Sequence, residues 1–465
     1  MTAVLLSRSE RQGRLTLLAL TLGSGVAILD GSIVNIALRT IGGELNASLA
    51  ELSWVVNGYL LSLASLVLVG GALGDRLGRR RVYLVGMTVF MLASAACALA
   101  QSPTQLIVLR VLQGVGAALL TPGALAIIQS SFGVEDRAPA IGTWAGLSGV
   151  AAAVGPFVGG WLVDHGGWRW IFGINIPLCL IVIAVTLYAV PESRNPDAVG
   201  RFDWTGAGLT VVALAASTYA LTAAGDGDSR GAWLGGVAAL VAGVGWVVSA
   251  RHTTHPLVPL SLFSSRVFSA ANAMTALVYG ALGAVFFVVV LQLQVSAGWS
   301  ALASGLSALP VTIALMLLSS RAASVADRIG PRLPMTIGPL VCAVGVVLLL
   351  GVGPGTQWWG VLPGMVVFAL GLAALVSPLT AAVLGAAPDQ QAGVASGVNN
   401  AVARAGSLLA VAAVPALAGL SGEAYQDPTA MTSGYRIAMV ACAVLLALGG
   451  LVSWFGLREK VRVGA

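Results

Sequence analysis

The sequence predicts an all-α integral membrane protein with 14 transmembrane helices, arranged as two six-helix bundles plus two extra central helices. Composition is the first reason, because 57% of the 465 residues are hydrophobic and 9% are charged, whereas a soluble domain carries about 25% charged residues. A long series of apolar runs and an internal repeat are the other two reasons. So few charges could not cover a water-facing surface, which excludes a soluble globular protein.

Apolar runs between charges and turn residues predict where the helices cross the membrane. A crossing needs about 20 mostly apolar residues, so fourteen crossings fill most of a chain of this length. The predicted spans are residues 15–38, 52–73, 82–101, 104–130, 140–163, 168–190, 205–224, 231–250, 267–294, 301–320, 333–352, 358–386, 397–420 and 433–457.

The basic residues predict the orientation of these spans. An even number of spans places both termini on the same side of the membrane. Most Lys and Arg residues lie in connectors on that side, and the opposite connectors, with the span ends beside them, hold only Arg39, Arg169, Arg230 and Arg436. Because basic residues concentrate in cytoplasmic connectors, we expect both termini in the cytoplasm and a multi-pass protein in the bacterial cytoplasmic membrane, surrounded by lipid.

Two short segments recur at nearly the same separation, which indicates a duplicated half. Asp75-Arg76-Leu77-Gly78-Arg79-Arg80 is followed 252 residues later by Asp327-Arg328-Ile329-Gly330-Pro331-Arg332. Thr121-Pro122 is followed 256 residues later by Ser377-Pro378. Repeats of this kind are common in transporters. The predicted domains are an N-terminal six-helix bundle (residues 1–195), two linking transmembrane helices (196–262) and a C-terminal six-helix bundle (263–465).

Asp30 is the one carboxylate that we place inside a predicted span. A membrane carboxylate is costly and normally faces the bundle interior, a partner or water. Arg110 in the fourth span reaches a comparable depth, so we expect an interior ion pair. The protonation state of such an acid depends on its hydration and on its distance from the cation, which suits proton coupling. The alternative is a permanent ion pair that fixes two helices.

Five motifs lie at characteristic places along the spans. They are Leu29–Leu38 in the first span, Gly71–Arg80 between the second and third, Arg110–Gly116 in the fourth, Gly155–Gly160 in the fifth, and Trp168–Phe172 with Asn175–Pro177 in the sixth. Together these motifs resemble those of the major facilitator superfamily, and more narrowly its fourteen-span drug:proton antiporter family. The resemblance implies the major facilitator fold and a multidrug or antibiotic exporter.

The loop motif and the fifth-span motif each have a mechanical interpretation. Glycines in the loop permit a tight turn while its acid and arginines form pairs that gate the inner side; alternatively the arginines only enforce topology and contact anionic lipid. The exporter signature gives a narrow, bent helix against which another helix slides, or alternatively only close packing. The gating-loop residues are Gly71, Gly74, Asp75, Arg76, Gly78, Arg79 and Arg80, and the signature residues are Gly155, Pro156, Gly159 and Gly160.

Polar and aromatic side chains within the spans are candidates for a substrate cavity, since rings and a few amides suit bulky amphipathic compounds. The alternative for each is a position facing lipid or a neighbouring helix. The candidates are Asn35, Trp54, Asn57, Gln113, Trp144, Tyr279, Phe286, Phe287, Gln292, Asn399, Asn400 and Arg404. Tryptophans near span ends are expected in the interfacial belt, and these are Trp161, Trp168, Trp170, Trp358 and Trp359.

The sequence indicates that a proton gradient is the energy source. It has no Walker P-loop and no connector long enough for a nucleotide domain, and one interior acid suits H⁺ better than Na⁺, which needs several oxygen ligands. The four Cys lie in apolar stretches without a CxxC pair, so we expect no metal site and no cofactor. We expect a monomer that binds no nucleic acid.

The function predicted from these observations is proton-coupled efflux of hydrophobic or amphipathic drugs by alternating access between the two bundles. A dedicated exporter of one metabolite, lipid or organic acid is the first alternative. A non-transporting membrane sensor is the second, although the intact loop motif and the interior charges argue against it. An enzyme is not expected, because no set of nucleophile, base and metal ligands is visible.

Overall fold

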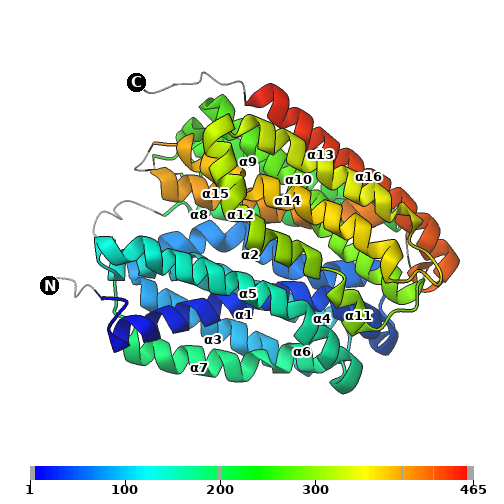
Figure 1. Ribbon diagram of the computed structural model, residues 1–465, viewed down its shortest axis with the longest axis horizontal. Helices are drawn as coiled ribbons and strands as arrows, with labels where there is room; N and C mark the ends of the chain where they lie inside the picture. The colour runs from blue at the N-terminus through cyan, green and yellow to red at the C-terminus, as the bar shows by residue number, and fades with distance from the viewer. Residues whose placement is uncertain are drawn as a thin grey trace. The chain divides into compact units, whose positions relative to one another are not determined.

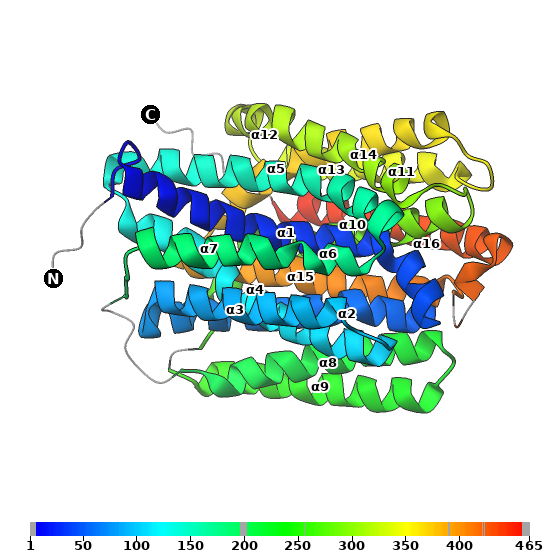
Figure 2. The same cartoon turned by 90° about the horizontal axis from the view of Figure 1, so that it is seen from below.

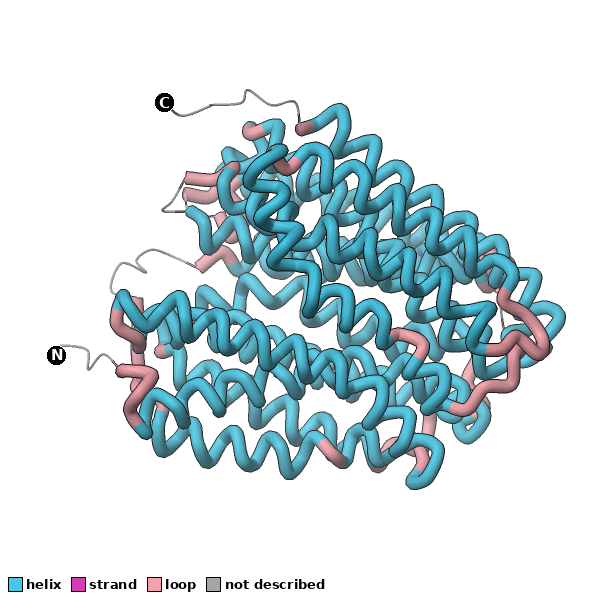
Figure 3. Tube along the Cα trace, in the orientation of Figure 1, coloured by secondary structure: helices cyan, strands magenta, loops and turns pink. Residues whose placement is uncertain are grey.

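The computed structural model describes residues 6–195, 202–254, 256–388, 391–420, 422 and 424–457. Helices and the loops between them make up nearly all of these residues (Figure 3). Within these ranges, the β-pairing is an isolated bridge between Leu6 and Phe132. The predicted all-α class is therefore confirmed.

Fourteen segments of the described chain are long and apolar enough to cross a membrane, as predicted. The chain is therefore a multi-pass membrane protein. The helices, labelled in Figure 1, are α1 (Arg11–Leu45), α2 (Leu49–Leu77), α3 (Arg79–Ala98), α4 (Pro103–Ser131), α5 (Val134–Gly166), α6 (Arg169–Gly173), α7 (Asn175–Ala189), α8 (Trp204–Gly225), α9 (Ser229–His252), α10 (Arg266–Val295), α11 (Ala301–Leu306), α12 (Leu309–Ile329), α13 (Arg332–Leu348), α14 (Trp358–Gly385), α15 (Ala392–Leu417) and α16 (Pro428–Gly456).

Two predicted spans are each built from two consecutive helices. The sixth span is divided between α6 and α7 at Ile174. Pro177 follows closely, and its missing N–H cannot bond the carbonyl four residues before it, which accounts for the break. The tenth span is divided between α11 and α12, and Pro310 occupies the first turn of α12, where proline is well tolerated.

The chain forms two compact units. The first contains Met1–Ala47 and Glu51–Val211, and the second contains Ser48–Ala50 and Val212–Ala465. The first unit therefore holds α1 to α7 with the start of α8, and the second holds the later helices. The predicted division into residues 1–195, 196–262 and 263–465 stays a prediction.

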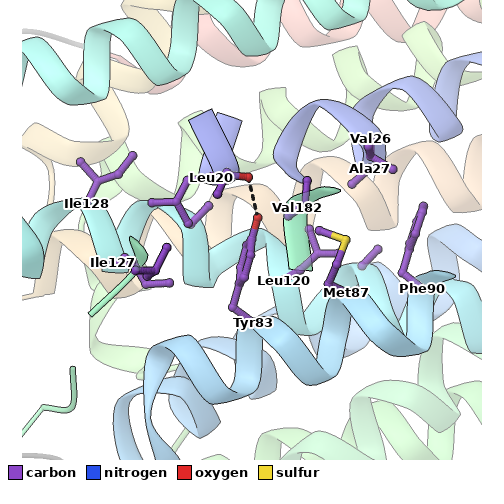
Figure 4. Packing of buried hydrophobic residues seen from close by; sticks show 14 of the residues in the cluster. Leu20, Val26, Ala27, Tyr83, Met87, Phe90, Leu120, Ile127, Ile128 and Val182 are labelled. Atoms are coloured by element: carbon purple, nitrogen blue, oxygen red, sulfur yellow. Dashed lines mark hydrogen bonds between the residues drawn. The ribbon is translucent and has the colours of Figure 1, made fainter. Parts of the chain in front are cut away.

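The core of the first unit lies where α1, α3, α4 and α7 meet (Figure 4). Tyr83 of α3 is fully buried there among Met87, Leu120 and Val182. Its hydroxyl donates a hydrogen bond to the Ala19 carbonyl of α1 over 3.2 Å, so the buried phenol keeps a partner. This core fixes the helices that carry the polar residues described below.

Glycines bring pairs of helices into close contact in the same way in each unit. In the first, Gly86 of α3 faces the backbone of Gly116 in α4; in the second, Gly338 of α13 faces the backbone of Gly371 in α14. Any side chain at these positions would collide with the neighbouring backbone, and small residues are what membrane helices use for such approaches. The packing therefore repeats, as the duplicated sequence segments do.

The two additional helices, α8 and α9, lie side by side as a hairpin (Figure 2). Asp228 caps α9 by accepting a hydrogen bond from the Gly231 amide over 2.9 Å. A Cβ on Gly235 would lie 3.0 Å from both the Ala216 carbonyl oxygen and Ala220. Close approach at Gly235 thus holds the hairpin together.

Candidate functional site

Asp30 lies near the middle of α1 and is 1% exposed. Its carboxylate accepts three N–H groups from two other helices. Gln113 Nε2 of α4 and Asn175 Nδ2 of α7 donate to Oδ1 over 2.9 and 3.0 Å. Arg110 Nη1 of α4 donates to Oδ2 over 2.5 Å. Both oxygens are thus hydrogen-bonded, as a buried charge requires.

Arg110 is also 1% exposed and has partners other than Asp30. Its Nη1 donates to Gln113 Oε1 over 2.7 Å, and its Nε donates to the Val55 carbonyl of α2 over 3.1 Å. Gln113 therefore bridges the two charges, because its oxygen accepts from Arg110 while its nitrogen donates to Asp30. Predicted as a cavity residue, Gln113 lies fully buried in this ion-pair network.

Two aromatic rings flank the guanidinium of Arg110. The ring centre of Tyr59 in α2 lies 4.4 Å from the guanidinium carbon, and that of Phe172 in α6 lies 5.8 Å away. Aromatic faces attract cations, most strongly where water is excluded. The Tyr59 hydroxyl donates to the Ala27 carbonyl over 3.2 Å, which holds this ring against α1.

Among Asp30, Arg110, Gln113 and Asn175, the carboxyl group of Asp30 is the titratable one. Arginine stays protonated in proteins and the amides do not titrate, so Asp30 is the group whose charge can change.

The Cys97 thiol of α3 approaches Gln113 Oε1 at 3.9 Å and is fully buried. Within the described residues, no group of three His, Cys, Asp or Glu is placed to hold a metal ion.

The gating loop joins α2 to α3 and turns at Gly78, whose φ of +115° suits glycine. Asp75 Oδ1 accepts a hydrogen bond from Arg79 Nε over 2.8 Å, and Arg79 Nη2 lies 2.7 Å from the same oxygen in an ion pair. Arg79 Nη1 donates to the Ala126 carbonyl of α4 over 3.3 Å. The Asp75 to Arg79 pair therefore connects the ends of α2, α3 and α4.

The segment after α7 also contacts this loop. The Glu192 carboxylate accepts a hydrogen bond from the Arg80 amide over 3.1 Å and lies 3.7 Å from Arg81 Nε. The Asn195 amide donates to the Asp75 carbonyl over 3.0 Å. Sequence reasoning did not single out Glu192, although an acid directly after a predicted span is a usable signal.

The remaining residues of the loop motif pack closely or contact an aromatic ring. A Cβ on Gly71 would lie 3.5 Å from Pro122 of α4, and the one on Gly74 would meet Arg79 at 3.8 Å. The Arg76 guanidinium lies 5.5 Å from the ring centre of Phe202. The motif therefore comprises the last turns of α2, the turn at Gly78 and the start of α3.

The exporter signature packs α5 against α1 close to Asp30. A Cβ on Gly155 would lie 2.8 Å from Ser32 Oγ, and one on Gly159 would lie 2.7 Å from Ile33. Side chains at these glycines would push the two helices apart. The signature residues Gly155, Pro156, Gly159 and Gly160 are all buried, and Pro156 lies inside the helix.

The cavity candidates of the first unit differ in burial. Asn57 is fully buried and neither polar atom of its side chain has a hydrogen-bond partner among the described residues. Asn35 and Trp54 are half-buried. Trp144 donates from Nε1 to Ser24 Oγ over 2.9 Å, joining α5 to α1. A cavity lined by them stays a prediction.

In the second unit, the candidates on α10 include two buried side chains. Phe287 is 1% exposed and Gln292 is fully buried, with Nε2 donating to the Val352 carbonyl over 3.0 Å. Tyr279 and Phe286 are half-buried. These positions make Gln292 a link between α10 and the loop that follows α13.

The candidates on α15 lie beside a polar cluster on α10. Asn399 Nδ2 donates to Thr275 Oγ1 over 2.8 Å and to Asn272 Oδ1 over 3.2 Å. Asn400 is exposed and Arg404 is half-buried. Asn272 and Thr275 were not predicted, because single amides and hydroxyls in apolar helices are common and carry little signal.

Trp168 differs from the other tryptophans near span ends in that protein atoms cover it, while its predicted interfacial depth stays a prediction. Its side chain is fully buried, and Nε1 donates to Glu44 Oε2 over 2.8 Å. Arg169 Nη1 donates to the same oxygen over 2.7 Å. A tryptophan near a span end usually lies at the interface, but here a carboxylate at the end of α1 supplies the partner that its N–H needs.

Sequence comparison places the chain among transporters. The family model of the Major Facilitator Superfamily matches residues 20–411. The tetracenomycin C resistance and export protein of Streptomyces glaucescens is 36% identical over 433 residues, which cover 91% of this chain and 79% of that protein. The multidrug resistance protein Stp of Mycobacterium tuberculosis is 34% identical over 411 residues, covering 87% of this chain and 75% of that protein.

Solved structures show the same fold. A bacterial homologue of the human lysosomal transporter Spinster, in an inward-facing and occupied conformation, matches with a TM-score of 0.70. The match covers 96% of this chain and 97% of that chain at 15% sequence identity. At this identity the likeness concerns the fold alone.

The bridging role of Gln113 predicts a measurable loss of stability on substitution. Gln113→Leu removes one partner from each buried charge, so we expect a loss of about 1–3 kcal/mol in the free energy of unfolding. The matched control is Gln105→Leu on the exposed part of α4, which should change little. Heating the protein in detergent with a maleimide dye measures unfolding, because the four cysteines are buried. Equal stabilities of the two variants would contradict the bridging role.

Proposed function

The chain belongs to the Major Facilitator Superfamily, and from that premise we propose that it is a proton-coupled exporter of hydrophobic or amphipathic drugs or antibiotics. It acts by alternating access in the bacterial cytoplasmic membrane, with both termini in the cytoplasm. The observation that carries the proposal is the fully buried Asp30 to Arg110 pair. The names of the two relatives, one for export and resistance and one for multidrug resistance, support the efflux part.

Protonation of Asp30 is the coupling step in this proposal. A proton on Oδ2 removes the negative charge beside Arg110 and weakens the attraction between α1 and α4. An isolated buried cation would be costly, but Arg110 retains Gln113 Oε1, the Val55 carbonyl and the Tyr59 ring. The pair can therefore be neutralised without leaving the guanidinium unpartnered.

The same helix passes the change to its neighbour. Ser32 and Ile33 follow Asp30 closely in α1. Ser32 packs on Gly155 of α5, and Ile33 packs on Gly159. A shift of α1 at Asp30 therefore changes the contact between α1 and α5, since the glycines have no side chains that separate the two helices. Movement of α1 against α5 then serves the alternation between inward-open and outward-open states.

A dedicated exporter of one antibiotic or other metabolite is the second candidate. The relative from Streptomyces glaucescens, whose name gives a single antibiotic, favours it. The two candidates differ in the number of chemically unrelated compounds to which cells producing the protein become resistant. A non-transporting sensor would give resistance to none and no flux in liposomes.

Asp30→Asn should abolish uphill export while leaving the protein folded. Asparagine resembles the protonated acid in size and charge, so the conformational cycle remains but no proton is released. In proteoliposomes with an imposed pH gradient, we expect loss of dye accumulation and survival of energy-independent dye exchange.

Two results would contradict this role of Asp30. One is pumping by the variant at the parental rate with the parental pH dependence. The other is a loss of about 3–5 kcal/mol in stability that the double variant Asp30→Asn with Arg110→Gln restores, because this identifies the pair as a permanent strut.

Asp75→Asn should slow transport and leave substrate affinity largely unchanged. The substitution weakens the pairing with Arg79 that connects α2, α3 and α4, and the loop acts on gating in this proposal. Transport rate and equilibrium dye binding are measured on the same preparation. Glu135→Gln neutralises another acid, an exposed one on α5, and should have the parental rate. A large loss of affinity with normal flux would count against gating.

Reporter fusions at residues 228 and 260 should fall on opposite sides of the membrane, with residue 260 in the cytoplasm. The two positions flank α9, which runs from Ser229 to His252, and the distribution of basic residues sets the orientation. Two reporters that are active on opposite sides of the membrane, such as alkaline phosphatase and a fluorescent protein, show on which side each position lies. Two cytoplasmic positions would show that α9 does not cross the membrane.

A further inference from the structure

Asn175, the first residue of α7, directs both hydrogens of its side-chain amide to acceptors. Nδ2 donates to Asp30 Oδ1 and to Ser94 Oγ, each over 3.0 Å. The side chain is fully buried, and its Oδ1 has no hydrogen-bond partner among the described residues. Asn175 thus donates both amide hydrogens, one to α1 and one to α3, while its carbonyl oxygen accepts no hydrogen bond from the described residues.

Ser94 is a second acceptor that holds the nitrogen end of that amide toward Asp30. Its hydroxyl donates its single hydrogen to the Phe172 carbonyl of α6 over 3.0 Å, so its oxygen can only accept from Asn175. A rotated amide would bring Asn175 Oδ1 against two other oxygens, those of Ser94 and Asp30. The nitrogen is therefore held toward the carboxylate.

The consequence for Asp30 is that its two oxygens are unequal. Oδ1 receives two neutral N–H groups, from Gln113 and Asn175. A proton placed on Oδ1 would face these donors and find no acceptor. Oδ2 faces Arg110, which has other partners and can release it. Hydrogen bonds to the charged form favour that form, so each N–H on Oδ1 opposes protonation of Asp30.

We propose that Asn175, oriented by Ser94, is a positioning residue that keeps Oδ1 of Asp30 as an acceptor and so sets the pH at which Asp30 takes up its proton at Oδ2. The inference rests on the proposed function, in which Asp30 carries the coupling proton. Asn175 contacts neither substrate nor cofactor in this role.

Other charged and titratable groups around Asp30 remain constant when Asn175 is changed. Arg110 of α4 is the charged partner. Cys97 of α3 and Cys179 of α7 lie within electrostatic range of Asp30, and Tyr59 of α2 faces Arg110. The packed part of α6 presents Phe172, and α5 presents glycines. A change in the proton uptake of the variants can therefore be assigned to the lost donor.

The test is infrared titration of the full-length protein in lipid nanodiscs. The carbonyl band of a protonated buried carboxyl group is followed against pH, and the part assigned to Asp30 is the part lost in Asp30→Asn. In Asn175→Leu the ionised form loses a donor, so protonation should persist to higher pH. We expect the midpoint to rise by about one pH unit, a roughly tenfold change in proton affinity.

A second variant and a matched control keep the result interpretable. Ser94→Ala leaves Asn175 in place but frees its amide, and should shift the midpoint in the same direction by a smaller amount. Thr186→Val changes another fully buried residue of α7, whose hydroxyl has no hydrogen-bond partner among the described residues, and should leave the midpoint at the parental value.

Unchanged midpoints in both Asn175→Leu and Ser94→Ala overturn the inference, even if both variants lose stability. If Asn175→Leu fails to fold, the Ser94→Ala midpoint decides alone. A folded parental protein whose Asp30 band does not titrate also overturns it. The proposed function is tested separately by flux: a parental protein that does not pump, yet shows the expected shifts, refutes the proposed function but still supports the effect of Asn175 on the protonation of Asp30.

Discussion

A carboxylate inside a membrane-spanning helix has to find hydrogen-bond donors within the protein, because neither lipid nor bulk water supplies them. Asp30 meets this requirement with N–H groups from Arg110, Gln113 and Asn175. These donors come from α4 and α7, so satisfying one charge on α1 fixes the positions of three helices. The glycine contacts of α1 with α5 and the apolar core around Tyr83 pack α1 against its neighbours as well.

The two halves share their packing but not this chemistry. The glycine approach of α3 to α4 recurs between α13 and α14, yet the residue 252 positions after Asp30 is Leu282 and the residue 256 positions after Arg110 is Val366. The polar contacts of the second unit lie elsewhere, at Asn399 and Thr275. Duplication thus preserved the close approach of helices, whereas the charged pair belongs to the first half.

The sequence predicted the features that depend on local properties. Span number follows from apolar length, and Asp30 and Arg110 stand out as charges within apolar runs. Asn175 was named only as part of a motif and Ser94 not at all, and their contacts near Asp30 were not predicted, because an amide or hydroxyl is tolerated in many positions of a membrane helix and only tertiary contacts select it. The burial of Trp168 against Glu44 was not predicted for the same reason, since the two residues are distant in sequence. Helix ends also differ: α12 continues to Ile329 past charges that ended the predicted span.

The geometry around Asp30 also bears on which ion the site can handle. A metal cation bound to a carboxylate needs further oxygen ligands directed at it. The groups directed at Asp30 are instead N–H donors, and the Gln113 oxygen is already bonded to Arg110. A cation placed at this carboxylate would therefore face hydrogens and a guanidinium, and would be repelled by both. A proton needs only one free lone pair and a partner that can withdraw, and Oδ2 opposite Arg110 offers both.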